Sequence, residues 1–315
     1  MPSEAKGVVV VGSITADVTA FSTRLPVPGE TVLGNDLTLV LGGKGANQAI
    51  SAAHYGSPTW FAGCVGDDLF ANLTRDGLRD HGVHSEWLDT VEGPTGVAHI
   101  RVDASGQNDI VITPLANAAL DEARVDRALA GLAEQVGVLL LQFETRVEIA
   151  RHAAGVARDL GLTVIVDPAP AVDVDPDLWP LVDIVTPNES EASRLTGVEV
   201  TGVEAAEAAA GWFLDRGVRR AVITLGDLGS VSVDADGAVV TPAYRVEAVD
   251  TTAAGDAFTG TLGAAIAQGV PHAEGLRVAA AAGALAVTRH GASPSLPGRE
   301  ETLALAYPQR EEIQA

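Results

Sequence analysis

The stretch GVVVVG at residues 7–12 is a short apolar run that leads into the turn signal Gly12-Ser13. A strand buried on both faces has such a run, because both sets of alternating side chains contact the core. Similar runs recur at Thr59–Val65, Gly137–Leu141, Leu162–Val166, Val182–Val185 and Ala221–Leu225. Helical patterns separate and follow them at Ala46–Tyr55, Leu69–His81, Arg146–Asp159, Gly202–Arg216, Ala257–Gln268 and Glu274–Arg289. The alternation predicts an α/β fold with a doubly wound, mostly parallel sheet and helices on both faces.

Two regions, 17–41 and 84–113, break this pattern. Apolar and polar residues alternate in them around turn signals such as Val27-Pro28-Gly29-Glu30. In Val97–Val102 and Asp109–Thr113 one face of each strand is apolar and the other polar, which is typical of antiparallel strands with one solvated side. The pattern predicts a second, smaller sheet, which is either a lid over a cleft or an extension of the sheet edge.

Composition narrows the class of protein. The 315 residues fit one large α/β domain or two small ones. With 42 acidic against 20 basic residues the formal net charge is −22, which disfavours nucleic acid and anionic membranes as partners. The single cysteine, Cys64, excludes an internal disulfide, and neither a signal peptide nor a run of about 20 apolar residues is apparent. We therefore expect a reduced, cytoplasmic protein.

The segment Asp250-Thr-Thr-Ala-Ala-Gly-Asp256-Ala-Phe-Thr-Gly260 is the densest candidate for chemistry. A strand is expected to end near Val249 and a helix to begin around Gly255. The free N–H groups of a helix start, beside the small residues Ala253, Ala254 and Gly255, can bind a phosphoryl group. Asp256 next to such an anion hole suits a general base for a hydroxyl nucleophile. The structural alternative is a glycine turn with Asp256 as a helix cap.

The loop Leu41-Gly-Gly43-Lys44-Gly-Ala-Asn47-Gln is the second candidate. Its glycines permit close backbone approach to a ligand, and Lys44 and Asn47 add a cation and an amide. Only two of the 20 basic residues are lysines, so the retention of lysine at this loop favours a need for a compact ammonium group.

Acids and amides after other predicted strands form a third group. Asn188 and Glu191 are three residues apart, a spacing that suits either Mg²⁺ carried with phosphates or a helix-capping box. Asp17 and Glu144 follow two strands, where parallel sheets usually bind ligands. Thr224 and Gly226 follow the strand that begins at Ala221 and are generic by themselves.

Taken in order, these segments resemble the ribokinase branch of the PfkB sugar-kinase family. The resemblance rests on GSITAD (12–17), PGETVLGN (28–35), GGKGANQA (42–49), LLLQFE (139–144), DPAPA (167–171), VDIVTPNESEASRLTG (182–197), ITLGDLG (223–229), DTTAAGDAFTG (250–260) and AVTRHGASPS (286–295). It implies an α/β core made of residues 1–16, 42–83 and 114–315, with a β-sheet lid made of residues 17–41 and 84–113. It also implies a homodimer that pairs through the lid sheets.

The resemblance further implies an ATP-dependent kinase that phosphorylates the 5-hydroxyl of D-ribose. Asp256 matches the base, and Ala253, Ala254 and Gly255 match the anion hole. The positions that match the sugar site are Asp17, Gly43, Lys44, Asn47 and Glu144, with Ala98 and Ile110 of the lid packing on the sugar. Asn188 and Glu191 match the pair associated with Mg²⁺ and phosphate, and Thr224, Gly226 and Ala280 match the nucleotide side. A loop for an activating K⁺ is matched by Asp250, Thr252, Ala286, Arg289, Gly291 and Ser295.

One position departs from the family pattern. Thr15 stands where the first motif usually has asparagine, and its shorter hydroxyl carries a methyl group. A lost or water-mediated hydrogen bond to a sugar hydroxyl is worth about 0.5–1.5 kcal/mol. The acceptor is therefore ribose or, alternatively, 2-deoxyribose, another small sugar or a nucleoside. A non-catalytic sugar or nucleotide sensor is an alternative from another class. A nicotinamide enzyme is disfavoured because no GxGxxG follows the first strand.

Overall fold

The computed structural model describes residues 6–308 and contains two sheets. The larger has nine strands, which are parallel except for a hairpin at one edge. In spatial order they are β13 (Gly237–Thr241), β12 (Ser230–Asp234), β11 (Arg220–Thr224), β10 (Ile184–Val185), β9 (Thr163–Val166), β8 (Val136–Leu141), β1 (Gly7–Val11), β4 (Thr59–Val65) and β5 (His84–Thr90). The strand order reverses direction around β1, so the doubly wound sheet is confirmed.

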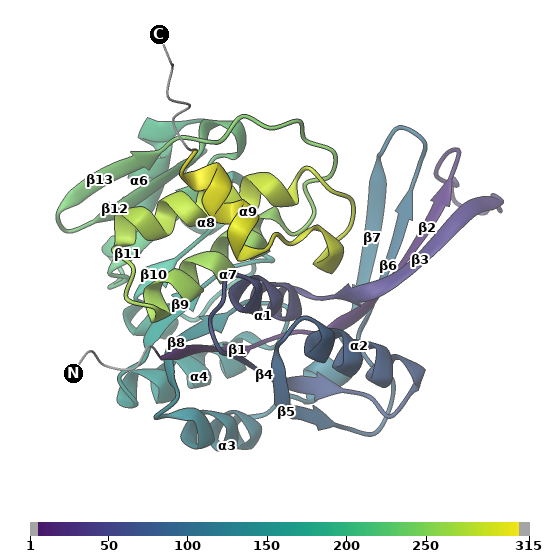
Figure 1. The fold of residues 1–315 in the computed structure, drawn as a ribbon, viewed down its shortest axis with the longest axis horizontal. Helices are drawn as coiled ribbons and strands as arrows, with labels where there is room; N and C mark the ends of the chain where they lie inside the picture. The colour runs from purple at the N-terminus through teal and green to yellow at the C-terminus, as the bar shows by residue number, and fades with distance from the viewer. Residues whose placement is uncertain (1–5, 309–315) are drawn as a thin grey trace, which may run out of the picture.

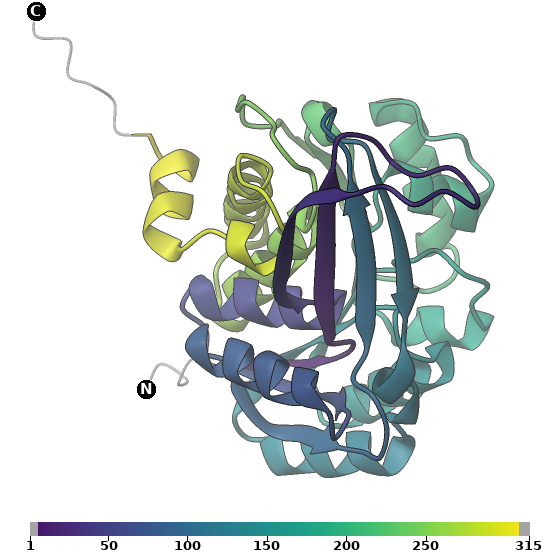
Figure 2. The ribbon, with the colours of Figure 1, turned by 90° about the vertical axis from the view of Figure 1, so that its right-hand side faces the viewer.

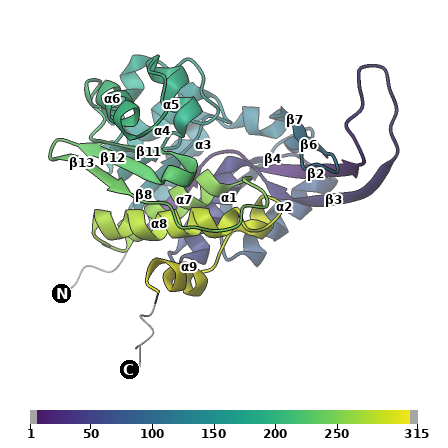
Figure 3. The same cartoon turned by 90° about the horizontal axis from the view of Figure 1, so that it is seen from above.

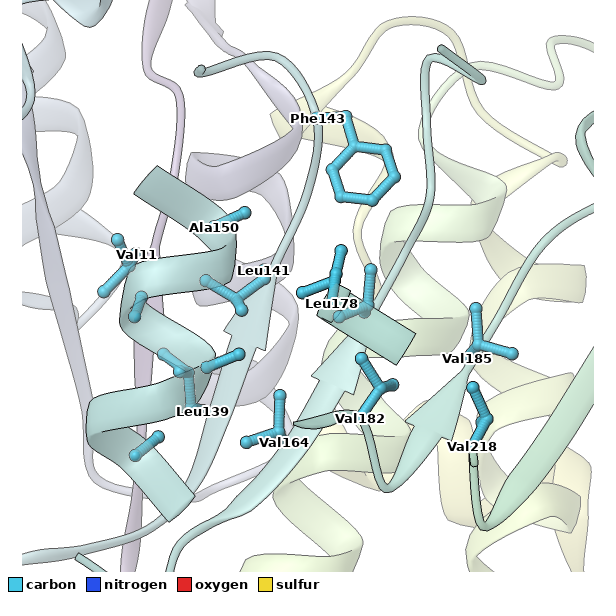
Figure 4. Packing of buried hydrophobic residues seen from close by; sticks show 14 of the residues in the cluster. Val11, Leu139, Leu141, Phe143, Ala150, Val164, Leu178, Val182, Val185 and Val218 are labelled. Carbon is cyan, nitrogen blue, oxygen red and sulfur yellow. The ribbon is translucent and has the colours of Figure 1, made fainter. Parts of the chain in front are cut away.

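The valines of β1 show why the sheet is buried on both sides. Val9 and Val11 belong to one apolar cluster, and Val8 and Val10 belong to the other. Figure 4 shows the first cluster, in which strand and helix side chains such as Leu141 and Ala150 interlock. Helices of that face are α3 (Glu122–Leu132), α4 (Val147–Asp159), α5 (Glu189–Thr196) and α6 (Val203–Leu214). Those of the other face are α1 (Lys44–His54), α2 (Leu69–Asp80), α7 (Ala254–Ala267), α8 (His272–Ala286) and α9 (Arg299–Ala306).

The smaller sheet stands off one side of this body (Figure 1) and presents a broad face in Figure 2. Its strands, in spatial order, are β3 (Gly34–Gly42), β2 (Thr15–Ser22), β6 (Val97–Val102) and β7 (Asn108–Thr113). The chain passes directly from β1 into β2 and from β3 into α1. The β2–β3 connection extends well beyond the body when the molecule is seen from above (Figure 3). This path places the base of the small sheet at the carboxyl ends of the parallel strands, next to the end of β1.

The prediction that residues 84–113 all belong to the small sheet is wrong for its first part. Residues 84–90 form β5, which pairs in parallel with β4 at the edge of the large sheet. An edge strand has one solvated face, so its alternation looks like that of a lid strand. Leu88 is buried while His84 is exposed, so β5 shows the alternation of buried and exposed residues that a lid strand also shows.

The expected strand that ends near Val249 is also wrong. Residues 242–249 have no regular structure, and the N–H groups of Val249 and Asp250 donate to the carbonyl oxygen of Val287 at the end of α8. The segment crosses a helix end instead of joining the sheet.

Of the run Val182–Val185, only Ile184 and Val185 pair as a strand. In residues 6–308 no helix is both long and apolar enough to cross a membrane.

Candidate active site

The candidate site lies where the parallel strands end, beside the reversal of strand order between β1 and β8. Ser13 follows β1, Glu144 follows β8, and Asp167 follows β9. This edge is the usual ligand crevice of an open α/β sheet. The starts of α1 and α7 meet there, and Figure 1 shows the two helices side by side.

The start of α7 has the shape of an anion site. Ala253 adopts a left-handed conformation with φ 60°, a strained choice for a residue with a side chain. The N–H groups of Gly255 and Asp256 donate no hydrogen bond within residues 6–308. A Cβ added to Gly255 would meet no atom within 4 Å, so the space in front of this residue is open. The turn can therefore accept an anion at the positive end of the helix dipole.

The carboxylate of Asp256 is buried, with the residue 4% exposed, and each of its two oxygens accepts a hydrogen bond. Asn47 Nδ2 donates to Asp256 Oδ2 at 3.0 Å, and Gln48 Nε2 donates to Asp256 Oδ1 at 3.2 Å. Lys44 Nζ lies 3.7 Å from Asp256 Oδ1. The structure thus joins Lys44, Asn47 and Asp256, which are up to 212 positions apart in the sequence, in one cluster.

Lys44 and Asp167 form the charged centre of this cluster, with 3.5 Å between Lys44 Nζ and Asp167 Oδ2. Burial alone would lower the pKa of Lys44, but the carboxylates of Asp167, Asp256, Glu144 and Glu191 outweigh it and raise the pKa. Burial raises the pKa of Asp167, against the opposing effect of Lys44. The ammonium group therefore stays charged.

Asp17 lies at the root of the small sheet beside Thr15. Thr15 Oγ1 donates to Asp17 Oδ1 at 2.6 Å. Burial raises the pKa of Asp17 to about 6, and the charges of Glu144 and Asp256 add to the rise while the Thr15 bond opposes it. A Cβ on Gly42 would lie 2.0 Å from Asp17 Oδ2, so glycine is required there for the carboxylate to fit. Gly43 has φ +90°, and a Cβ there would lie 2.9 Å from Ile14 Cα.

Glu144, which follows β8, connects this strand to the segments that follow β1 and β3. Its Oε2 accepts from Ser13 Oγ at 2.6 Å and from the backbone N–H of Lys44 at 2.9 Å. Both bonds use one oxygen, so the other is available to a ligand hydroxyl. The charges of Glu144 and Asp256 both contribute to the raised pKa of Asp17.

Asn188 and Glu191 form the capping box that was the structural alternative. Asn188 Oδ1 accepts from Glu191 N at 2.9 Å, and Glu191 Oε2 accepts from Asn188 N at 2.9 Å. The charge of Glu191 nevertheless contributes to the raised pKa values of Lys44 and Asp167. Residues 6–308 hold no group of three or more His, Cys, Asp or Glu side chains arranged for a metal ion.

The predicted nucleotide-side residues are only partly brought together. Thr224 pairs with Asn188 in an isolated bridge, and Thr224 N donates to Pro187 O at 3.0 Å. A Cβ on Gly226 would lie 3.7 Å from Glu189 Oε1, which places Gly226 beside the start of α5. Ala280 is half-buried on α8 and packs on the core.

The loop predicted for a monovalent cation is assembled around one carboxylate. Asp250 Oδ1 accepts from the hydroxyl and the N–H of Thr252, and Asp250 Oδ2 accepts from Gly291 N at 2.9 Å. Ser295 caps its own turn by donating to Ala292 O, and Ala286 O accepts from Arg289 N at 3.2 Å. The Arg289 side chain pairs with Glu301 and so turns to α9.

A cleft of about 650 Å³ separates the small sheet from the body. Its lining includes Asp17 and Ile110 from the sheet and Asp250, Thr252 and Gly291 from the loop. Ala98 is buried opposite Asp17 in the register of β2 and β6. A second depression of about 770 Å³, lined by Asp183, Arg219 and His272 among others, lies where the parallel strands begin and contains none of the predicted site residues. Five of the predicted site residues line the first cleft, which is therefore the candidate for the site, although Lys44, Asn47, Glu144 and Asp256 are not among the residues that line it.

Four side chains of the site were missed from the sequence: Ser13, Gln48, Gln142 and Asp167. Asp167 carried the signal already used for Glu144, an acid directly after a parallel strand. No feature of the sequence singles out the two glutamines, because an uncharged amide within a helix, as at Gln48, or after a strand, as at Gln142, forms no recognisable pattern.

A doubly wound sheet with a small sheet over a cleft, a carboxylate at a helix N-terminus and a half-buried lysine beside it are typical of a phosphoryl-transfer enzyme of the sugar-kinase class. The model of the pfkB family carbohydrate kinases matches residues 5–299, and the chain belongs to this family. It is 38% identical to a ribokinase from Haemophilus influenzae over 95% of this chain and 97% of that one. It is 34% identical to a deoxyribokinase from Salmonella typhi over 93% of this chain and 96% of that one. The solved ribokinase of Arabidopsis thaliana, complexed with ribose and ATP, superposes with a TM-score of 0.90 at 36% identity and covers 96% of this chain and 99% of its own.

Proposed function

We propose that the protein transfers the γ-phosphoryl group of ATP to the 5-hydroxyl of D-ribose, which gives D-ribose 5-phosphate. The observation that carries this proposal is the buried Asp256 carboxylate beside the free N–H of Gly255 and the ammonium of Lys44. A base, an anion site and a fixed cation are the parts that phosphoryl transfer to a hydroxyl requires. The ribokinase relatives and the ribose- and ATP-bound neighbour support the choice of substrates.

In this proposal the residues of the site act on the attacking hydroxyl, the moving phosphoryl group and the sugar. Asp256 takes the proton of the attacking hydroxyl while the start of α7 and Lys44 stabilise the charge of the moving group. Asp17 and Glu144 accept hydrogen bonds from sugar hydroxyls. Asn47 Oδ1 is buried with no hydrogen-bond partner in the described part of the chain, so it offers one more acceptor to the sugar. The small sheet excludes water, which would otherwise hydrolyse ATP.

Two metal ions belong to this proposal. Asn188 and Glu191, at the start of α5, would hold Mg²⁺ through water molecules together with the phosphates, as carboxylate and amide oxygens suit this ion. Bound Mg²⁺ would neutralise phosphate charge. The residues of the loop around Asp250 would hold an activating K⁺ through carbonyl oxygens, since the Asp250 carboxylate is already occupied by Thr252 and Gly291.

One observation favours 2-deoxyribose as a second candidate. The Thr15 hydroxyl donates its proton to Asp17, so it has no proton left for the sugar's 2-hydroxyl oxygen. A site with fewer hydrogen-bond partners for the 2-hydroxyl loses less when the sugar lacks that group. It therefore discriminates less against 2-deoxyribose. A deoxyribokinase is also among the relatives.

We further propose a homodimer through the outer face of the small sheet. Thr38 and Val40 line the cleft, so Leu37 and Leu39, which alternate with them along β3, face away from it and are 60% and 41% exposed. Val111 on β7 has the same orientation and is 65% exposed. An apolar face of this kind fits a second copy of the chain. The cytoplasmic location and the absence of nucleic-acid partners stay predictions from the composition.

A sugar panel with coupled detection of ADP tests the proposal. Ribose, 2-deoxyribose, other small sugars and nucleosides are compared by kcat/KM, each with K⁺ and with Na⁺. We expect ribose to lead and K⁺ to raise turnover. A higher kcat/KM for 2-deoxyribose would select the second candidate. Sugar binding by calorimetry without ADP under any ion condition would indicate a sensor.

A further inference from the structure

The side-chain amide of Gln48 bridges two carboxylates behind the reacting groups. Gln48 Nε2 donates to Asp167 Oδ2 at 2.8 Å and to Asp256 Oδ1 at 3.2 Å. The carboxyl oxygens accept both hydrogen bonds, so the NH₂ end of the amide faces them. An amide turned the other way would direct a carbonyl oxygen at both carboxylates and lose both bonds.

A second glutamine fixes this orientation. Gln142 Nε2 donates to Gln48 Oε1 at 2.6 Å, so the carbonyl end of Gln48 has its own donor. A Cβ on Gly12 would lie 2.1 Å from Gln142 Oε1, which means that Gly12 leaves the space in which the Gln142 amide sits. That Oε1 has no hydrogen-bond partner among the described residues, so the contacts to Gln48 and Gly12 hold the amide in place.

Both glutamines are more deeply buried than the groups that would touch the substrate. Gln48 is 0% exposed and Gln142 is 1% exposed, whereas Asn47 and Asp256 are each 4% exposed. They therefore act on substrates only through other groups. Gln48 comes from α1 and Gln142 follows β8, so the pair also links these elements to α7 at the position of Asp256.

We propose that Gln48, oriented by Gln142, is a positioning residue that fixes the Asp256 carboxylate for proton removal and keeps Asp167 beside it. The proposal rests on the proposed kinase function. Without the amide, two buried carboxylates would share only Lys44, at 3.5 and 3.7 Å, and would repel one another. Asp256 would then turn about its side-chain bonds and lose the alignment held by Asn47 on its other oxygen.

Gln48→Met, Gln142→Met and the double variant test this proposal. Methionine keeps the approximate volume of glutamine and removes its amide. We expect each single variant to lower kcat by roughly tenfold to a hundredfold, with KM for sugar and for ATP changed less than threefold. Because Gln142 acts through Gln48, the double variant should lose no more kcat than Gln48→Met alone.

Ser51→Ala is the matched control. Ser51 lies one turn further along α1, is 1% exposed, and donates to Ala257 O of α7 at 2.9 Å without contact to either carboxylate. It should lower the Tm and leave kcat within twofold of wild type. Full kcat in Gln48→Met, or losses that multiply in the double variant, would overturn the proposal. Failure of the kinase function itself shows separately, as a wild-type protein that forms no ADP with any sugar.

Discussion

Lys44 Nζ lies 3.5 Å from Asp167 Oδ2 and 3.7 Å from Asp256 Oδ1, so one ammonium group serves two buried carboxylates. The chain has a net charge of −22, and a kinase must bind an anionic nucleotide. In the proposed function, the start of α7, bound Mg²⁺ and one of only two lysines would supply positive charge beside the phosphates.

Replacement of Lys44 by arginine tests the need for a compact cation. A guanidinium is planar and larger, and it cannot take the same position between Asp167 and Asp256. We expect Lys44→Arg to lower kcat/KM by roughly tenfold to a hundredfold in the coupled assay. Arg219→Lys, an exposed exchange far from the cleft, is the control. Wild-type kinetics in Lys44→Arg would show that the lysine is incidental.

Replacement of Asp256 by asparagine removes the base and keeps the shape. We expect Asp256→Asn to lower kcat by roughly 10²–10⁴-fold, because the hydroxyl proton loses its acceptor. ATP binding, measured by calorimetry, should stay within a few-fold of wild type, since the N–H groups at the start of α7 are retained. Near-normal turnover would contradict the assignment of the base.

The raised pKa of Asp17, about 6, predicts that sugar binding weakens in acid. Below that pH the carboxyl is protonated and loses acceptor capacity for sugar hydroxyls. We expect KM for ribose to rise as the pH falls through about 6, while KM for ATP changes less. A flat KM for ribose between pH 7.5 and 5 would contradict the assigned role of Asp17.

The same shift predicts a stability effect with a definite sign. The folded state holds the Asp17 proton up to about pH 6, whereas the unfolded state releases it near the ordinary aspartate pKa of 3.8. Stability therefore falls as the pH rises through this window, and the buried charge destabilises the fold above it. We expect Asp17→Asn to raise the Tm at pH 8 and to lose this advantage below about pH 4. A lower Tm for the variant at pH 8 would show that the ionised carboxylate stabilises the fold.

Thr15→Asn tests the origin of sugar preference. The longer amide has two N–H donors, so it can donate one to Asp17 and the other to the 2-hydroxyl oxygen of ribose. We expect the ratio of kcat/KM for ribose over 2-deoxyribose to rise by roughly twofold to tenfold, in line with one added hydrogen bond. Thr15→Ser, which keeps the hydroxyl, should leave the ratio near that of wild type. An unchanged ratio in Thr15→Asn would place the preference elsewhere.

Leu39→Glu tests the proposed dimer. A carboxylate in the apolar outer face of the small sheet would be buried without a partner on dimerisation. We expect wild type to sediment as a dimer and Leu39→Glu as a monomer. Glu86→Gln on edge strand β5 serves as a surface control. A monomeric wild type at micromolar concentration would exclude this interface.

Local patterns predicted most of the framework. β4 spans Thr59–Val65 and β6 spans Val97–Val102, as their apolar run and alternation indicated. The start of α7 at Ala254 lies one residue from the expected position. Prediction failed where one pattern has two structural causes, as with the alternating residues of β5, which join the large sheet.

The sequence by itself determined the class of fold, the acids after the parallel strands, and the small-residue turn before Asp256. Each of these is a local property of residue type and spacing. Only the tertiary structure decided which groups meet. The bonds of Gln48 to Gln142, Asp167 and Asp256 join residues 94 to 208 positions apart, and no local pattern encodes such contacts. They exist because the fold brings the ends of β8 and β9 and the starts of α1 and α7 to one buried point, where a polar group without a partner costs free energy.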